Sequence, residues 1–269
     1  MALTPIQREV CRLLAGRRRT SGESYVAGGT ALNELLHAPR RSRDVDIFHD
    51  TEAALAATWP ADRDLLQASG FTVRVLRESA GFVEALASGE RGTVLIQWAR
   101  DSAYRFFPLM EDATLGLTLH RFDLAVNKVL ALAGRLEPRD WIDVLQCDEK
   151  LQPMGYLAWA ACGKDPGFSP ASLLTEARRG GRYSQAELDA LDFEGPPPDA
   201  ATLGRQWHAA MAEAESVCAL LPVEQAGCAV LTSAGEWCRA PASDLANEAS
   251  RRALVFHAGS IGGAWPRVR

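Results

Sequence analysis

The sequence has no long hydrophobic run, no export signal and no paired cysteine motif, and each absence excludes a class of protein. The longest apolar stretch, Leu157–Cys162, is far shorter than the ~20 residues that a membrane span requires. Residues 1–5 lack the basic and apolar regions of a secretory signal, so we expect a cytoplasmic protein with no membrane partner. The six cysteines are scattered without a C-x-x-C pair, which predicts buried reduced thiols rather than a zinc site.

The chain also lacks an excess of positive charge. It has 29 Lys and Arg against 34 Asp and Glu, a net charge of −5, which argues against coating nucleic acid by bulk charge. Basic residues nevertheless cluster at 17–19, 40–43 and 178–182. Either a solvated face or a local polyanion site would account for each cluster.

The hydrophobic periodicity predicts an α+β protein. Strand patterns occur at 24–27, 45–48, 71–76, 81–87 and 93–98, between helix patterns at 4–15, 31–36 and 51–67. We expect Thr30 to cap the second of these helices and Pro60 to break the third. Beyond about residue 120 the patterns are helical, at 122–135, 139–150, 155–162, 170–179, 184–191 and 200–220, with a possible hairpin of 228–231 against 236–239. The predicted organisation is a small mixed β-sheet core within residues 1–150, followed by a mostly helical C-terminal region, 151–269.

Two glycines follow the first predicted strand directly and precede a helix. Gly28 and Gly29 would let a phosphate approach the backbone, and the start of the helix would offer unpaired N–H groups and a partial positive charge. This pattern favours a phosphate-binding turn.

Two carboxylates then stand at alternate positions of the next strand. Asp44 and Asp46 flank Val45, so both side chains are expected on one face of the sheet. Two like charges so close require a cation between them, and Mg²⁺ with substrate phosphates is the usual occupant. A phosphate-binding turn followed by a D-x-D strand indicates phosphoryl or nucleotidyl transfer.

In this order and spacing, the residues resemble the DNA polymerase β-like nucleotidyltransferase superfamily. Gly28-Gly29-Thr30-Ala31-Leu32 with Arg40-x-Ser42-x-Asp44-Val45-Asp46 is more closely similar to the AbiEii/MenT group of nucleotidyltransferase-like toxins. A second stretch supports the narrower resemblance: Lys128 within the helical segment 122–132, followed by Arg139-Asp140-x-x-Asp143. The resemblance extends over roughly residues 20–150.

The resemblance implies transfer of a nucleoside monophosphate from a nucleoside triphosphate to a hydroxyl, with the 3′ end of tRNA as acceptor in characterised relatives. Asp44 and Asp46 would bind Mg²⁺ and act in catalysis. The nucleotide would be held by Gly28, Gly29, Thr30, Ser42, Lys128 and Asp143, with Lys128 contacting the triphosphate as a catalytic residue. A cognate antitoxin would be a partner.

One position departs from the superfamily pattern. Most members carry a third carboxylate on a later strand, and the matching position here is Gln97. An amide oxygen can ligate Mg²⁺, but glutamine cannot act as a base. Asp101 could substitute only if the chain bends at 99–100, and Glu90 is at the wrong end of the strand. Two other functions therefore stay open: nucleotidylation of a protein or small molecule, and a catalytically weak protein that binds a nucleotide or a partner.

Overall fold

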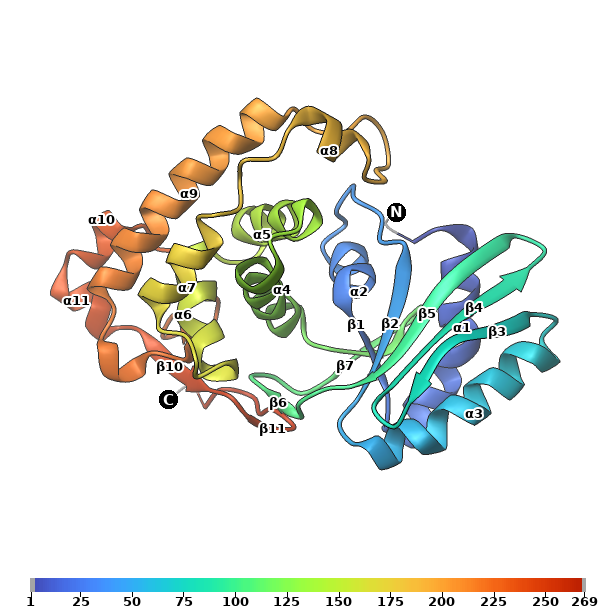
Figure 1. Ribbon diagram of the computed structural model, residues 1–269. Helices are drawn as coiled ribbons and strands as arrows, with labels where there is room; N and C mark the ends of the chain where they lie inside the picture. The colour runs from blue at the N-terminus through green and yellow to red at the C-terminus, as the bar shows by residue number, and fades with distance from the viewer. Residues whose placement is uncertain (1–2, 268–269) are drawn as a thin grey trace. The chain divides into compact units, whose positions relative to one another are not determined.

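The computed structural model describes residues 3–267 and divides the chain into two compact units (Figure 1). The first unit comprises residues 3–103, 108–124 and 192–195, and the second comprises 104–107, 125–191 and 196–267. The helix that carries Lys128 therefore belongs to the second unit, whereas the boundary expected at residue 150 assigned it to the first. The combination of a mixed sheet with a helical C-terminal region confirms the α+β class.

The first unit is built on a seven-stranded sheet in the order β3-β4-β5-β2-β1-β8-β7. Strands β2 and β5 are parallel, as are β1 and β8, and the other neighbours are antiparallel. Its elements are α1 (Pro5–Ser21), β1 (Tyr25–Ala27), α2 (Gly28–Leu35), β2 (Asp44–His49), α3 (Glu52–Ala68), β3 (Thr72–Ser79), β4 (Phe82–Gly89), β5 (Gly92–Arg100), β7 (Met110–Asp112) and β8 (Gly116–Thr118).

Helices α1 and α3 cover one face of this sheet (Figure 1). Along β2, β4 and β5 every second side chain is buried, as expected for strands with one face against a core. Trp98 of β5 packs against Trp59 of α3 with ring centroids 4.6 Å apart, and its indole N–H donates to Asp62 Oδ2 at 3.0 Å. The alternate residues of the same strands, including both aspartates of β2, are only half-buried on the opposite face.

The break expected at Pro60 is absent, because α3 continues without interruption from Glu52 to Ala68. Pro60 has no N–H to donate to the carbonyl of Ala56, four residues earlier. Both residues are exposed, so water can bond to that carbonyl and the helix continues.

The second unit is mostly helical, with a core formed by α6, α9 and β9. Tyr156 and Trp159 of α6 pack with Val217 of α9 and Val230 of β9. Its elements are β6 (Tyr104–Arg105), α4 (Arg121–Arg135, whose first turn lies in the first unit), α5 (Pro138–Lys150), α6 (Met154–Lys164), α7 (Pro170–Ala177), α8 (Gln185–Asp189), α9 (Ala200–Leu220), η1 (Val223–Gln225), β9 (Cys228–Leu231), α10 (Ala242–Leu245), α11 (Glu248–Arg252), β10 (Val255–Ala258) and β11 (Ser260–Ile261).

The hairpin expected of 228–231 against 236–239 forms only in part, because the strand that pairs with β9 along its length is β10. The nearer segment contacts this region through an isolated bridge between Leu231 and Trp237 and through two backbone hydrogen bonds, Cys238 N–H to Val230 O at 3.2 Å and Thr232 N–H to Glu236 O at 2.8 Å. Gln152 is fully buried, and its amide donates to the carbonyls of Val230 and Cys238 at 2.9 and 2.8 Å. The carbonyl of Val230 thus accepts from both Cys238 and Gln152, and the Gln152 side chain links the two segments.

Within residues 3–267, no helix has both the length and the apolar character needed to cross a membrane. All six cysteines are unpaired, and four of them are buried: Cys11, Cys147, Cys162 and Cys238.

We predict that acid weakens the folded state through two buried histidines. Burial lowers the pKa of His49 and of His120 to about 4, from an ordinary value near 6.5. Between these pH values the unfolded chain binds protons that the folded chain refuses, so stability is lost as the pH falls from 6.5 toward 4. Each histidine should contribute a slope of up to about 1.4 kcal/mol per pH unit. Urea unfolding of the parent and His49→Gln at pH 7 and pH 5 measures this, and an equal loss in both proteins would contradict the assignment.

Candidate nucleotide and metal site

The candidate site begins where β1 meets α2 without an intervening loop. Gly28, the first residue of α2, has φ +65°, a conformation that glycine adopts without strain. Ala27 provides no side-chain cap for the first turn of the helix. The N-terminal N–H groups of α2 therefore have no side chain of the N-cap to bond, which suits a helix start that binds an anionic ligand.

The carboxylate of Asp46 lies directly against Gly28. A Cβ atom added to Gly28 would be 1.7 Å from Asp46 Oδ2, so a side chain at position 28 would displace the carboxylate. The antiparallel register of β1 and β2 causes this approach, because it sets Ala27 opposite Asp46. The predicted turn and the predicted D-x-D strand thus meet at one point.

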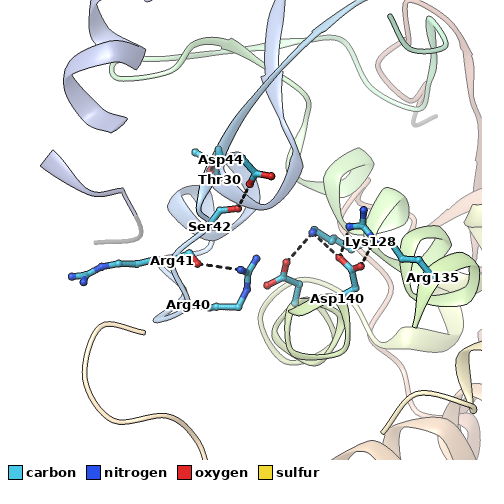
Figure 2. Close-up of polar contacts among 9 residues, drawn as sticks. Thr30, Arg40, Arg41, Ser42, Asp44, Lys128, Arg135 and Asp140 are labelled. Carbon is cyan, nitrogen blue, oxygen red and sulfur yellow. Dashed lines mark hydrogen bonds and ion pairs between the residues drawn. The ribbon is translucent and has the colours of Figure 1, made fainter. Parts of the chain in front are cut away.

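Asp44 is held by the residues around it (Figure 2). Ser42 Oγ donates to Asp44 Oδ1 at 2.8 Å, and the hydroxyl of Thr30 donates to the backbone carbonyl of Asp44. Thr30 was expected to cap α2, but the helix starts at Gly28, so Thr30 lies inside it and links α2 to β2 instead. The structure therefore gathers Gly28, Gly29, Thr30, Ser42, Asp44 and Asp46 in the first unit.

Arg40 is a site residue that the sequence analysis named in a basic cluster and in the resemblance motif, but to which it gave no role. Its side chain is buried, and its Nη2 would be 2.8 Å from a Cβ added to Gly29. Its Nη1 donates to the carbonyl of Arg41 at 3.1 Å (Figure 2). A guanidinium beside the glycine turn adds a cation where a phosphate would approach.

The donor set of this site fits a hard divalent cation bound together with a substrate. No three His, Cys, Asp or Glu side chains gather as a metal cluster anywhere within 3–267. Two carboxylates beside an uncapped helix start match the way Mg²⁺ is held, by one or two carboxylates plus substrate phosphates and water.

Lys128 and Asp143 lie together in the second unit, in a buried ion cluster with Asp140. Lys128 Nζ is 2.9 Å from Asp140 Oδ1 and 3.0 Å from Asp143 Oδ2. Lys128 is 6% exposed, and neither aspartate is exposed. The Arg-Asp-x-x-Asp spacing causes this arrangement, because aspartates three residues apart on α5 share one face.

Asp140 remains ionised despite its burial. Burial alone would raise its pKa, but the hydrogen bond from Arg135 and the charge of Lys128 outweigh it and hold the pKa below its usual range. Arg135 Nε donates to Asp140 Oδ2 at 2.6 Å, as Figure 2 shows. The cluster is a charged network in which each group depends on its partners.

The position of the missing third carboxylate is also resolved. Gln97 of β5 is the Cα partner of Asp46 on β2. Asp101 lies beyond the end of β5, where its Oδ1 accepts from the N–H of Ser102, and Glu90 lies in the β4–β5 turn. Neither residue replaces Gln97.

Comparison with known proteins finds solved structures with a similar fold. No family model matches the chain, and no curated protein sequence matches it. Among solved structures, the fold is similar to that of MenT4, a nucleotidyltransferase toxin of Mycobacterium tuberculosis H37Rv, with 15% identity, a TM-score of 0.52, and coverage of 81% of this chain and 83% of that chain. A candidate nucleotidyltransferase of H. pylori (15% identity, TM-score 0.45, coverage 80% and 99%) and JHP933 of Helicobacter pylori (14%, 0.44, 77% and 90%) are also similar. The chain has a MenT-like nucleotidyltransferase fold, which confirms the resemblance.

We predict that Gly28→Ala disrupts the site beyond its effect on the backbone. Gly22 provides the matched control, because it has φ +70° and a Cβ added there meets nothing within 4 Å. Both alanine variants should lose about 1–2 kcal/mol from the left-handed conformation, but only Gly28→Ala displaces the Asp46 carboxylate. Thermal unfolding and Mn²⁺ titration of both variants measure the difference. Wild-type Mn²⁺ binding by Gly28→Ala would show that the contact with Asp46 is not needed.

Proposed function

We propose that this protein is a Mg²⁺-dependent nucleotidyltransferase that moves a nucleoside monophosphate from a nucleoside triphosphate to an acceptor hydroxyl and releases pyrophosphate. The observation that carries the proposal is the contact between the Asp46 carboxylate and the bare Cα of Gly28. It brings metal-binding chemistry to an uncapped helix start, and each alone is common whereas the two together suit a metal–triphosphate.

Each of the site residues in the first unit has a role in this proposal. The N–H groups at Gly28 and Gly29 bind phosphate oxygens, and Arg40 adds positive charge beside them. Asp44 and Asp46 hold the Mg²⁺, while Ser42 and Thr30 fix Asp44. Bound Mg²⁺ would neutralise the charge that develops on the phosphates during transfer. Catalysis of this kind depends mostly on positioning and electrostatics.

We assign Lys128 to the triphosphate on the strength of the family resemblance. Its Nζ lies 2.9 Å from Asp140 Oδ1 and 3.0 Å from Asp143 Oδ2. These carboxylates fix the ammonium in one position, which lowers the entropy cost of contacting a ligand. Asp143 then acts as a positioning residue for Lys128.

An arginine-lined groove supports RNA as the acceptor, and the tRNA 3′ end is the acceptor that the family resemblance implies. The groove lies in the first unit and has a volume of about 780 Å³. Its lining includes Arg8, Arg12, Arg41 and Arg91, with only Glu9 and Glu194 of opposite charge. In a chain of net charge −5, this concentration of arginine favours a ligand that carries several phosphates.

The arginines of the groove differ in how closely they pair with carboxylates of the protein. Arg8 pairs with Glu34 at 2.9 Å, and Arg91 lies 3.6 Å from Glu9. Arg41 is 3.9 Å from its closest carboxylate, and Arg12 forms no ion pair with any residue in 3–267. In Figure 2 the side chains of Arg40 and Arg41 extend in different directions, although the residues are adjacent. Arg40 lies beside Gly29, and the next residue, Arg41, lines the groove. This connection would let the end of an RNA bound in the groove reach the site.

The likeness to MenT4, a nucleotidyltransferase toxin, supports a further proposal that this chain acts as the toxin of a toxin–antitoxin pair with a cognate antitoxin. The shared fold is the basis for it.

Incorporation of label tests the proposed reaction. The protein is incubated with Mg²⁺, total cellular RNA and protein, and each of four α-labelled nucleoside triphosphates. We expect label in RNA, and none with Asp44→Asn/Asp46→Asn, which removes both charges while preserving side-chain size. Label in protein would move the acceptor, and nucleotide binding without any transfer would favour a catalytically weak protein.

We predict that Arg12→Glu weakens tRNA binding and its dependence on salt. Each phosphate contact contributes roughly one unit to the slope of log affinity against log salt, so this slope should become shallower by about 1. Arg74→Glu, on β3 outside the groove, is the matched control, because Arg74 is also exposed and forms no ion pair within 3–267, and it should bind as the parent does. Fluorescence anisotropy over a salt series measures both, and equal slopes in the two variants would remove the groove from the acceptor site.

A further inference from the structure

Three side chains lie in one row across the sheet of the first unit. Asp46 of β2 is the Cα partner of Gln97 on β5, and Gln97 is the Cα partner of Glu84 on β4. Neighbouring strands are about 4.8 Å apart, so Gln97 stands between the two carboxyl side chains. All three occupy the alternate, half-buried positions of their strands.

Glu84 fixes the orientation of the Gln97 amide. Gln97 Nε2 donates to Glu84 Oε1 at 2.7 Å. An ionised carboxylate only accepts hydrogen bonds, so the NH₂ group must face Glu84 and the amide oxygen must point away from it. No donor to Gln97 Oε1 occurs among the contacts of residues 3–267, which leaves this acceptor available to a ligand.

The oxygen that is left available belongs to a good ligand for a hard cation. Amide and carboxylate oxygens are both ligands of Mg²⁺ and Mn²⁺. A carboxylate that accepts from an amide N–H also polarises the amide and increases the negative charge on its oxygen. By polarising the amide, Glu84 increases the negative charge on Gln97 Oε1 and so partly compensates for the carboxylate that is absent from position 97.

We propose that Gln97 supplies a third protein oxygen to the cation bound by Asp44 and Asp46, and that Glu84 is the positioning residue that orients it. This rests on the proposed function, because it concerns the same metal. Glu84 acts through the glutamine and does not itself ligate, in keeping with the lack of a three-carboxylate cluster within 3–267.

Glu84→Gln tests the orientation. The new amide can donate to Gln97 Oε1 as readily as it accepts from Nε2, so the fixed orientation is lost while size is kept. We expect the Mn²⁺ dissociation constant, measured by electron paramagnetic resonance without nucleotide, to rise at least about 10-fold, as for other outer-shell partners. Glu90→Gln, the same change in the exposed β4–β5 turn, should leave it unchanged.

A reversed pair separates positioning from a structural role. In Glu84→Gln/Gln97→Glu, the amide donates from β4 to a carboxylate on β5, so the hydrogen bond is kept and a charged oxygen occupies position 97. We expect Mn²⁺ affinity at least equal to that of the parent. Near-ultraviolet circular dichroism and thermal unfolding identify any variant that has lost its fold, and Gln97→Leu then provides a second removal of the oxygen.

The outcomes distinguish this inference from the proposed function. Parent-like Mn²⁺ binding by Glu84→Gln or Gln97→Leu, together with loss of binding by Asp46→Asn, would overturn the role of Gln97 and retain the metal site. Failure of the reversed pair to recover affinity would also overturn the positioning role. Absence of Mn²⁺ binding by the parent would overturn the proposed metal site and this inference with it.

Discussion

The close approach of the Asp46 carboxylate to the Cα of Gly28 is the constraint on which the candidate site depends. The register of the short β1–β2 pair places Asp46 opposite Ala27, the last residue of β1. Because α2 begins at the next residue, the start of the helix lies beside the same carboxylate. A side chain at Gly28 would displace the carboxylate, and a longer turn would move the helix start away. Sequence, register and chemistry therefore meet in one contact, which explains why a glycine pair precedes a D-x-D strand.

The neighbouring residues maintain that contact rather than create it. Ser42 and Thr30 bond to Asp44, and Arg40 lies against Gly29, so the loop between α2 and β2 follows the helix start closely. In the second unit Lys128 is held in the same manner, by two buried aspartates from one face of α5. Each unit thus carries polar side chains that are fixed by partners before any ligand binds, which reduces the entropy lost on binding.

Much of this architecture could be predicted from the sequence, and the failures have physical causes. The glycine turn, the D-x-D strand and the long helices follow from local patterns. The uninterrupted helix at Pro60 depends on which side of α3 meets solvent, and the strand partner of β9 is β10, which sets Val230 opposite Phe256, 26 residues later. Neither fact is local. Glu84 was missed because its position opposite Gln97 depends on the register of the β4–β5 hairpin, which pairs Gly89 with Gly92. The predicted strands at 81–87 and 93–98 left five residues between them, and a turn of that length does not fix the register.

The central claim is that Asp44 and Asp46 hold a divalent cation beside a triphosphate at the start of α2. Crystals of the protein grown with Mn²⁺ and a non-hydrolysable nucleoside triphosphate test it directly, because Mn²⁺ is located by its anomalous scattering. The account predicts an anomalous peak about 2 Å from carboxylate oxygens of both aspartates, with phosphate density at the N–H groups of Gly28 and Gly29. A bound triphosphate elsewhere, or Mn²⁺ that contacts neither aspartate, would contradict it.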